Sequence, residues 1–252
     1  MFDIITIGDT TTDIFLSVDE KSKLCSVDKK KTELRLKFAS KVPVKELHRV
    51  IGAGNASNHA FGATKLGLNI AIYTIIGDDD AGEAVQNKME KAKISTNYVV
   101  VDKKHGTNMS IIIDYSGDRT IMSYHADRAY HLPEFAPTKW IYFSSIGSGH
   151  EKFNNKLNEY VKNKRIKLGF NPGSRQIILD MKVLKPILEV TEILFVNKQE
   201  GEKLAKKTGN IKSILKSLRE FGPKIVVMTD GGNGSYCYDG ENFYKLGVMK
   251  LP

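Results

Sequence analysis

The local fold of this chain is decided by the stretch Gly52-Ala53-Gly54-Asn55-Ala56-Ser57-Asn58-His59-Ala60-Phe61-Gly62-Ala63-Thr64-Lys65-Leu66-Gly67. Its first glycines allow backbone conformations and close approaches that a Cβ would forbid, so a small polar ligand can lie against main-chain N–H groups. Ala56, Ala60, Ala63 and Leu66 then recur at helical spacing, and Gly67 ends the predicted helix. The apolar run 69–76 that follows is short enough for a buried strand. The stretch therefore predicts one loop–helix–strand unit with a ligand site at its loop.

Two asparagines, Asn55 and Asn58, fall on this loop or on the first helical turn. A side-chain amide both donates and accepts hydrogen bonds, which suits a ligand rich in hydroxyl groups. A plain tight turn that opens a core helix is the structural alternative to such a site.

Two nucleotide-binding motifs are alternative interpretations of the same glycines. A dinucleotide fingerprint needs a strand directly before them, but residues 45–49 are polar and charged, and a serine stands where the third glycine belongs. We therefore expect no strand there, and a NAD-dependent dehydrogenase is the least favoured enzyme. A P-loop is excluded because neither Gly-Lys-Ser nor Gly-Lys-Thr occurs in the sequence.

The whole stretch resembles the N-terminal signature of the ribokinase-like (PfkB) family of carbohydrate kinases, with matches at Gly54, Asn58, Leu66, Gly67 and Gly77-Asp78. The resemblance implies a three-layer α/β sandwich with a central, mostly parallel sheet, helices on both faces and a small β-sheet lid. It also implies an enzyme that uses ATP and Mg²⁺ to phosphorylate a hydroxymethyl group of a sugar or sugar derivative. A nucleoside kinase of the same fold, or a fragment that only binds ligand, is the alternative.

Length and composition are consistent with one α/β domain over residues 1–252, because no linker, low-complexity segment or internal repeat divides the chain. Cys25 and Cys237 are too few and too scattered for a disulfide framework or a cysteine metal site, so we expect a reducing, cytoplasmic location. The N-terminus lacks the features of a signal peptide, and no run approaches the ~18 apolar residues of a membrane span. We therefore expect neither secretion nor a membrane partner.

The formal net charge of +9 raises the question of nucleic-acid binding. The basic runs, Lys29-Lys30-Lys31 and the group within residues 162–167, are interleaved with apolar residues and lack an aromatic stacking pattern. Solvated faces explain them more simply, and we expect no nucleic-acid partner. A positive field also attracts phosphorylated or acidic small molecules.

The N-terminal run Phe2–Ile7 predicts a buried strand that ends in the polar segment Gly8–Asp13. Ligands bind at such carboxyl ends in parallel sheets. Asp13 can accept hydrogen bonds from two neighbouring hydroxyl groups, and the resemblance implies that it holds the sugar. A loop-capping aspartate is the alternative.

Three segments predict a half-exposed antiparallel sheet: residues 34–38, 109–114 and 120–124, the last two joined by a turn at 116–118. The resemblance implies that strands within about 14–50 and 107–126 form a lid over the substrate. Such a lid would keep water away from the phosphoryl donor. Its exposed sheet could also pair with a second copy of the chain.

In the second half, strands are predicted at 140–146, 168–170, 193–196 and 225–228, with amphipathic helices between them and a final hairpin. Without the resemblance, the segments after these strands are ordinary turns and a helix with an acidic first turn. The resemblance implies a substrate or phosphate contact for Arg175, which follows Asn171. It assigns Asn197 to the nucleotide phosphates and Glu200 to Mg²⁺ through water, and it assigns to the nucleotide pocket the residues Thr229, Gly231 and Gly234.

The resemblance also implies a Gly-x-Gly-Asp motif that supplies an anion hole and the general base. No such motif follows Leu251, so the base is expected beyond Pro252, and the 252 residues alone are expected not to transfer phosphoryl groups. If they do, the base lies among Asp78, Asp79 and Asp80. The strand ending at Ile146 delivers serines, Ser144, Ser145 and Ser148, instead of the glutamate of ribose-specific members, so ribose is not the favoured acceptor.

Overall fold

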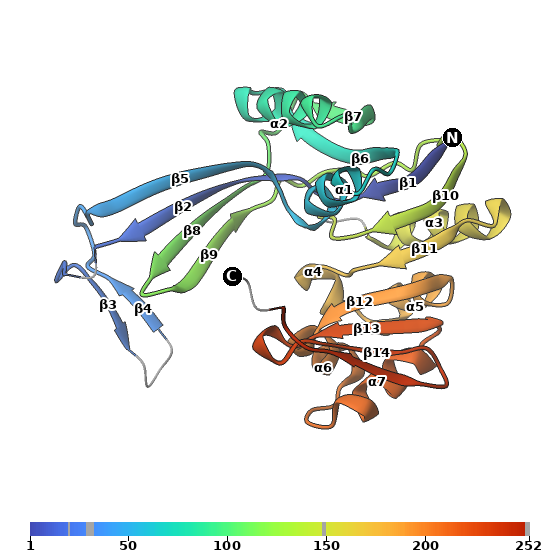
Figure 1. Cartoon of the computed structure of the whole chain (residues 1–252). Coiled ribbons are helices and arrows are strands. Elements are labelled where there is room, and N and C mark those ends of the chain that lie inside the picture. Colours follow the sequence, from blue (N-terminus) through green and yellow to red (C-terminus); the bar gives the residue numbers. More distant parts are fainter. Residues whose placement is uncertain (20, 29–32, 148–149, 250–252) are drawn as a thin grey trace.

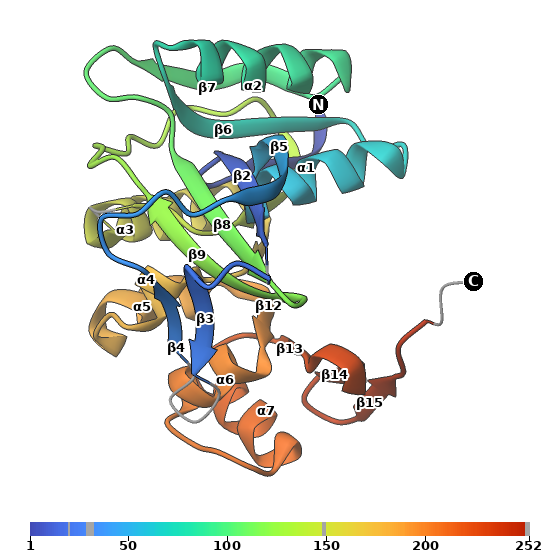
Figure 2. The same cartoon turned by 90° about the vertical axis from the view of Figure 1, so that its left-hand side faces the viewer.

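The computed structural model describes residues 1–19, 21–28, 33–147 and 150–249. The lysine run 29–31 and Ser148 lie outside these ranges. The described chain forms one large sheet with helices on both of its faces, a second sheet that projects from it, and a short β-hairpin (Figures 1 and 2). None of the described helices has the length and apolar character needed to span a membrane.

The large sheet has nine strands in the order β15-β14-β13-β12-β11-β10-β1-β6-β7. All neighbours from β13 to β7 are parallel, and β14 and β15 add antiparallel to β13. This arrangement confirms the predicted mostly parallel sheet. Its strands are β1 (Phe2–Ile7), β6 (Ile70–Gly77), β7 (Ser95–Asp102), β10 (Thr138–Phe143), β11 (Lys167–Phe170), β12 (Thr191–Asn197), β13 (Ile225–Thr229), β14 (Ser235–Tyr238) and β15 (Phe243–Leu246).

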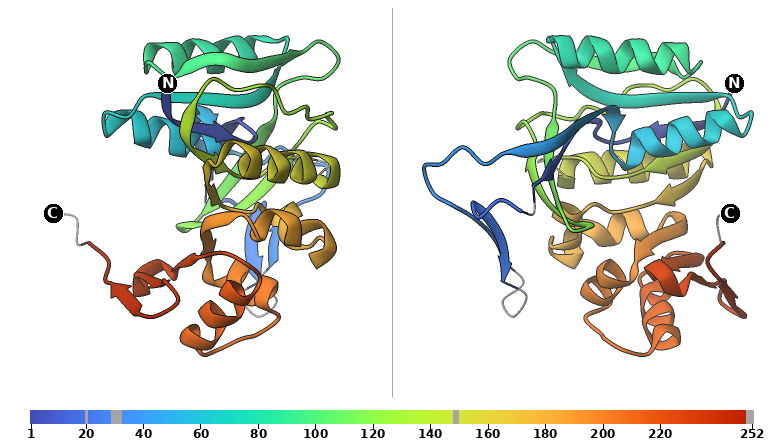
Figure 3. Two further views of the ribbon diagram at one scale, coloured as in Figure 1. Left: turned by 90° about the vertical axis from the view of Figure 1, so that its right-hand side faces the viewer. Right: turned by 60° about the vertical axis from the view of Figure 1, so that its left-hand side comes forward.

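Helices cover both faces of this sheet, which confirms the predicted three layers (Figures 1 and 3). On one face lie α1 (Asn55–Lys65) and α2 (Asp80–Lys91), and their apolar side chains form a cluster with β6. On the other face lie α3 (His150–Lys164), α5 (Met181–Leu188), α6 (Lys198–Ala205) and α7 (Ile211–Glu220). The short elements α4 (Ser174–Ile177) and η1 (Gly231–Asn233) follow β11 and β13.

The strands of the large sheet have apolar residues on both sides because helices cover both faces of the sheet. Phe143, Phe153 and Phe170 are fully buried between the sheet and α3 and α5. On the opposite face the small residues Ala56 and Ala60 let α1 approach the sheet closely. Leu66, which stands at helical spacing after Ala63, does not continue this buried row, because α1 ends at Lys65 and Leu66 is its C-cap, 82% exposed.

The second sheet has the order β5-β2-β8-β9. It consists of β2 (Thr11–Val18), β5 (Val44–Ala53), β8 (Met109–Tyr115) and β9 (Asp118–Tyr124). The strands β8 and β9 and their turn agree with the prediction. The expectation of a wholly antiparallel sheet is wrong, because β2 and β8 both leave the large sheet in the same direction and pair in parallel.

The expectation that no strand precedes Gly52 is also wrong. Residues 45–49 lie in β5, which runs directly into the glycine loop. This strand pairs antiparallel with β2 at the exposed side of the second sheet, so it tolerates charged residues. It is not the buried parallel strand of a dinucleotide fold, so a NAD-dependent dehydrogenase stays the least favoured enzyme.

Three further boundaries differ from prediction. The strand expected at 34–38 is β4 (Glu33–Leu36), which pairs with β3 (Cys25–Asp28) in a separate hairpin and not with the second sheet. The strand expected at 140–146 ends at Phe143. The loop expected to run to Arg175 is shorter, because α4 begins at Ser174.

Candidate functional site

A cleft of about 610 Å³ lies along the carboxyl ends of β11 to β13 and beside the first turns of α1. The described helices on the α1 face cover β1, β6 and β7 (Figures 1 and 3). The cleft lies beside them, over β10 to β13. Its polar lining consists of Asn55, His59, Tyr142, Asn171, Asn197, Glu200 and Thr229. Its floor is apolar, from Trp140, Ile193, Phe195 and Val227.

The topology of the sheet places a crevice next to this cleft. Within the large sheet, the next strand after β1 along the chain is β6, which lies on one side of β1. The next strand after β10 is β11, which lies on the opposite side. Because β1 and β10 are parallel neighbours, the loops at their carboxyl ends diverge. Open α/β sheets bind ligands at such a switch point. The loops here are residues 8–10 and 144–147.

The glycine loop packs tightly against this crevice. Gly54 has φ 97°, and a Cβ built on it would lie 2.9 Å from the carbonyl oxygen of Asp9, so the position requires glycine. No side chain caps the first N–H groups of α1, and these groups attract anions or hydroxyl oxygens. Asn58 lies in the first turn with its side chain exposed.

Asn55 connects this helix start to the neighbouring strands. Its Nδ2 donates to Asn171 Oδ1 at 3.0 Å, and Asn171 Nδ2 donates to the carbonyl of Phe195 at 2.9 Å. These two amides therefore fix the helix start against the ends of β11 and β12.

His59 and Tyr142 form a stacked pair in the wall of the cleft, and neither was predicted. Their ring centroids are 3.8 Å apart with the planes 5° from parallel. Burial lowers the pKa of His59 to about 4, so the ring is neutral at pH 7, and its Nδ1 lies 2.9 Å from Thr6 Oγ1. Burial also raises the pKa of Tyr142 to about 12. The pair gives the cleft a flat and uncharged surface.

Asn197 and Glu200 form a capping box at the start of α6. The Asn197 N–H donates to Glu200 Oε2 at 2.8 Å, and the Glu200 N–H donates to Asn197 Oδ1 at 2.9 Å. Both residues also line the cleft. Among the described residues no three His, Cys, Asp or Glu side chains cluster as metal ligands. A cation held by Glu200 would thus take its other oxygen ligands from water and phosphate, as Mg²⁺ commonly does.

Thr229 lies directly beside Asn197, because the two residues are register partners on β13 and β12. Gly231 and Gly234 follow in the turn and do not line the cleft. Both have positive φ, and a Cβ on Gly234 would clash with the carbonyl of Leu246. These glycines therefore shape the hairpin that carries Thr229.

The structure brings together only part of the predicted site. Asn55, Asn197, Glu200 and Thr229 line one cleft. Asp13 lies on β2 of the second sheet, where its Oδ1 accepts a hydrogen bond from Thr11 Oγ1 at 2.8 Å. Arg175 lies on α4 with its side chain exposed. The predicted residues outside the lining of the cleft are Asp13, Gly54, Asn58, Arg175, Gly231 and Gly234.

Asp79, one of the three alternative bases, has a structural role at the start of α2. Its carboxylate accepts from the N–H of Gly82 at 2.8 Å and from the N–H and Oγ1 of Thr107 at 2.8 and 2.6 Å. Burial acts to raise the pKa of Asp79, but the hydrogen bonds from Thr107 and Gly82 outweigh it and lower the pKa. Residues 78–80 line a different depression, at the end of β6.

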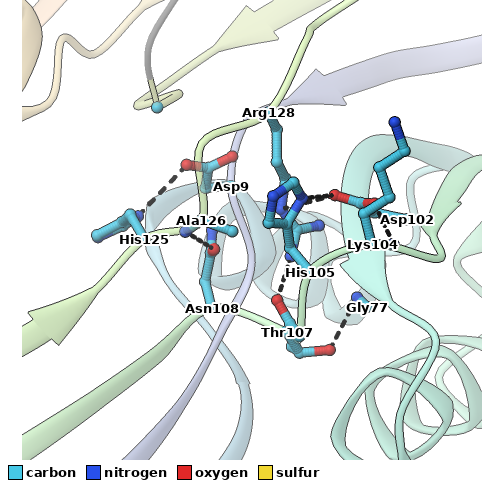
Figure 4. A network of polar contacts seen from close by, with 12 residues as sticks. Asp9, Gly77, Asp102, Lys104, His105, Thr107, Asn108, His125, Ala126 and Arg128 are labelled. Carbon is cyan, nitrogen blue, oxygen red and sulfur yellow. Dashed lines mark hydrogen bonds and ion pairs between the residues drawn. The ribbon is translucent and has the colours of Figure 1, made fainter.

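A polar network that no sequence pattern predicted joins the large sheet to the base of the second sheet (Figure 4). Asp9, which follows β1, accepts a hydrogen bond from the Tyr130 hydroxyl at 2.7 Å, and its Oδ2 lies 3.5 Å from His125 Nδ1. On the other side of the network, Arg128 donates to the carbonyl of Gly106 and lies 3.9 Å from Asp102. The residues involved are up to 121 positions apart, so no local motif could reveal them.

Comparison with known proteins shows the family to which this chain belongs. A match to the pfkB family of carbohydrate kinases covers residues 17–247. The chain is 23% identical over 243 residues to a nucleoside kinase of Methanothermobacter thermautotrophicus, an alignment that covers 95% of this chain and 73% of that protein. It is 27% identical over 194 residues to a cytidine kinase of Thermococcus kodakarensis, covering 75% and 68%.

Among solved structures, a ribokinase of Cryptococcus neoformans var. grubii serotype A in complex with ADP is similar to this chain. The TM-score is 0.75 and the identity 19%, over 100% of this chain and 80% of that one. The similarity shows that the two proteins share a fold.

Proposed function

Because this chain belongs to the pfkB family of carbohydrate kinases, we propose that it transfers the terminal phosphoryl group of ATP to a hydroxymethyl group of a sugar or nucleoside. The observation that carries this proposal is the single cleft at the ends of parallel strands that Asn55, Asn197, Glu200 and Thr229 share. Positioning and electrostatic stabilisation account for most of the catalysis in such transfers.

The acceptor site of this proposal lies between the glycine loop and the second sheet. Asp13 accepts hydrogen bonds from neighbouring hydroxyl groups, and Asn55 and Asn58 complete the recognition of the acceptor with their amides. Gly54 lets the acceptor approach the N–H groups of α1, and Arg175 neutralises phosphate charge. The second sheet acts as a lid that limits access of water.

The nucleotide lies in the cleft in this proposal. Asn197 contacts the phosphates, Glu200 holds Mg²⁺ through water, and Thr229 with the turn of Gly231 and Gly234 lines the nucleotide pocket. The donor set of Glu200, water and phosphate oxygens fits Mg²⁺, a hard cation that retains several waters. When bound, this ion neutralises charge that develops on the phosphates.

The general base is proposed to lie outside these residues, because no Gly-x-Gly-Asp occurs in the 252-residue sequence. The hydrogen bonds of Asp79, which serve the start of α2, support this view. A coupled ADP-release assay should detect turnover only with a form of the protein that supplies such a motif. Comparable turnover by residues 1–252 alone would contradict the proposal.

The acceptor class is tested by a thermal-shift panel of hexoses, pentoses, 2-keto sugar acids and nucleosides. Binding at ~100 times Kd adds about 2.7 kcal/mol to the stability, which raises the melting temperature by several degrees. The names of the two relatives favour a nucleoside, whereas the family description favours a sugar. If no compound shifts the melt of folded protein, the proposed acceptor site is wrong.

The proposal extends to the assembly and the location of the protein. Register places Leu47, Met122 and Tyr124 on one face of the second sheet, where they are 67%, 51% and 50% exposed. Such an apolar patch supports a homodimer formed by two second sheets. The free thiols of Cys25 and Cys237 support the proposed location in a reducing cytoplasm. We further propose that the protein has no nucleic-acid or membrane partner.

A further inference from the structure

A buried carboxylate lies at the switch point of the large sheet, outside every role assigned above. Asp9 directly follows Gly8 at the end of β1 and is 3% exposed. Its N–H donates to the carbonyl of Ser145, in the loop after β10, at 2.7 Å. A buried carboxylate is costly unless it has partners, so the groups around Asp9 are informative.

One of its oxygens is fixed by Tyr130. The Tyr130 hydroxyl donates to Asp9 Oδ1 at 2.7 Å and accepts from the N–H of Gly147 at 2.9 Å. Burial and the charge of Asp9 raise the pKa of Tyr130, so the hydroxyl keeps its proton and remains a donor. This arrangement leaves Oδ2 as the oxygen that faces His125.

The backbone next to His125 is fixed, but a ring nitrogen of His125 has no hydrogen-bond partner among the described residues. Its Nδ1 is buried 3.5 Å from Asp9 Oδ2 and has no hydrogen-bond partner among the described residues. The backbone beside it is fixed, because Ala126 N–H donates to Asn108 Oδ1 at 3.0 Å. The side chain as a whole keeps 21% of its surface exposed. The ring therefore lies beside the buried carboxylate of Asp9 (Figure 4) and keeps part of its surface accessible to a ligand.

The neighbourhood of this ring is the proposed acceptor site. Gly54 packs against the carbonyl of Asp9. Asp13 and Ser123 lie in one cross-strand row through β8 and so point to the same face, about 10 Å apart at two strand spacings. His125 follows two residues after Ser123, at the base of the second sheet.

We propose that His125, oriented by Asp9, is a further acceptor-binding residue, a role that rests on the proposed function. Asp9 Oδ2 accepts a hydrogen bond from Nδ1–H and so selects the tautomer in which Nε2 carries a lone pair. Nε2 then accepts a hydrogen bond from a hydroxyl group of the acceptor. The 3.5 Å contact shortens when the acceptor fixes the ring, as such contacts commonly do on binding. Asp9 acts through His125 and is a positioning residue.

The tautomer is tested by nitrogen-15 NMR of protein with labelled histidines. We expect His125 to carry its proton on Nδ1, and we expect Asp9→Asn to lose this preference because an amide can also donate. A proton on Nε2 in the unliganded protein would overturn the proposed orientation.

The binding role is tested by titrating the labelled protein with cytidine and with D-fructose. The probe that binds should shift the His125 ring signals, and His125→Ala should weaken its binding about ten-fold, the value of one hydrogen bond. ATP binding should not change. His105→Ala is the matched control, because His105 Nδ1 also lies 2.9 Å from a carboxylate, that of Asp102, in the same network. Thermal melts establish that both variants are folded.

The outcomes separate this inference from the proposed function. Binding of either probe that leaves the His125 ring signals unmoved, or equal affinity of His125→Ala and the unchanged protein, rejects the role of His125 alone. Failure of both probes to bind folded protein rejects the acceptor site and the role of His125 with it.

Discussion

Asn197 and Glu200 combine a structural contact with a proposed binding role. Each side chain accepts the backbone N–H of the other, which satisfies two of the free donors at the start of α6. The capping box therefore holds both side chains at the cleft before any ligand arrives, which reduces the entropy that binding must overcome.

Asn197→Ala should lower both stability and nucleotide affinity. Loss of an N-cap costs about 1 kcal/mol, or roughly 2–4 °C in melting temperature for a domain of this size. Asn210→Ala is the matched control, because Asn210 caps α7 by accepting from Ser213 N–H at 3.2 Å and does not line the cleft. Calorimetric titration with ATP should show weaker binding for Asn197→Ala only. An equal loss of affinity in both variants would mean that the effect is one of stability.

His59 predicts a pH dependence of stability. Its pKa is about 4 in the folded protein and 6.5 in the unfolded chain, so the unfolded chain binds the proton more tightly. The contribution of the neutral ring to stability is fully present above about pH 6.5, declines as the pH falls, and is lost by about pH 4. In urea titrations across this range, the midpoint of His59→Gln should fall less than that of the unchanged protein. Parallel curves would contradict the burial of a neutral ring.

A site residue can be predicted when the residues that form its pattern are close together in the sequence. Asn197 and Glu200 stand three apart after an apolar strand, so a local pattern was enough to single them out. The stack of His59 on Tyr142 and the contact of Asp9 with His125 join residues that only the sheet topology brings together. No local pattern encodes such contacts.

The stability of α1 depends on how closely its start packs against the end of β1. Gly54→Ala should destabilise the protein by about 1–3 kcal/mol, because the residue has positive φ and its Cβ would meet the Asp9 carbonyl at 2.9 Å. Gly67→Ala, at the other end of α1, shares the positive φ but meets nothing within 4 Å. Urea denaturation should therefore show a larger loss for Gly54→Ala than for Gly67→Ala. Equal losses would attribute the cost to backbone strain alone.

The elements of the large sheet were predictable because strands covered on both faces read as unbroken apolar runs. The same rule explains what was missed. The strand β5 is exposed along most of its length and carries Lys45, Glu46 and Arg49, so its sequence reads as a polar loop. Its pairing with β2 shows only in three dimensions. The parallel pairing of β2 with β8 joins segments about 90 residues apart, and no local signal marks it.

The switch point of the large sheet determines where the large sheet and the second sheet meet. The second sheet leaves the large sheet beside the ends of β1 and β10, which is where ligands bind in open α/β sheets (Figures 1 and 2). Asp13 lies at the base of the second sheet, whereas Asn55 lies on α1, which packs against the large sheet. Movement of one sheet relative to the other would therefore open or close the proposed acceptor site.

One face of the second sheet predicts the assembly. If two second sheets pair through the face of Leu47, Met122 and Tyr124, then Met122→Lys should convert a dimer to a monomer, because it buries a charge in an apolar interface. Ile121→Lys is the matched control, since Ile121 is 53% exposed on the same strand and points to the opposite face. Light scattering coupled to gel filtration measures the mass of each variant. A monomer for the unchanged protein at tens of micromolar, or dissociation by both substitutions, would contradict an interface on this face.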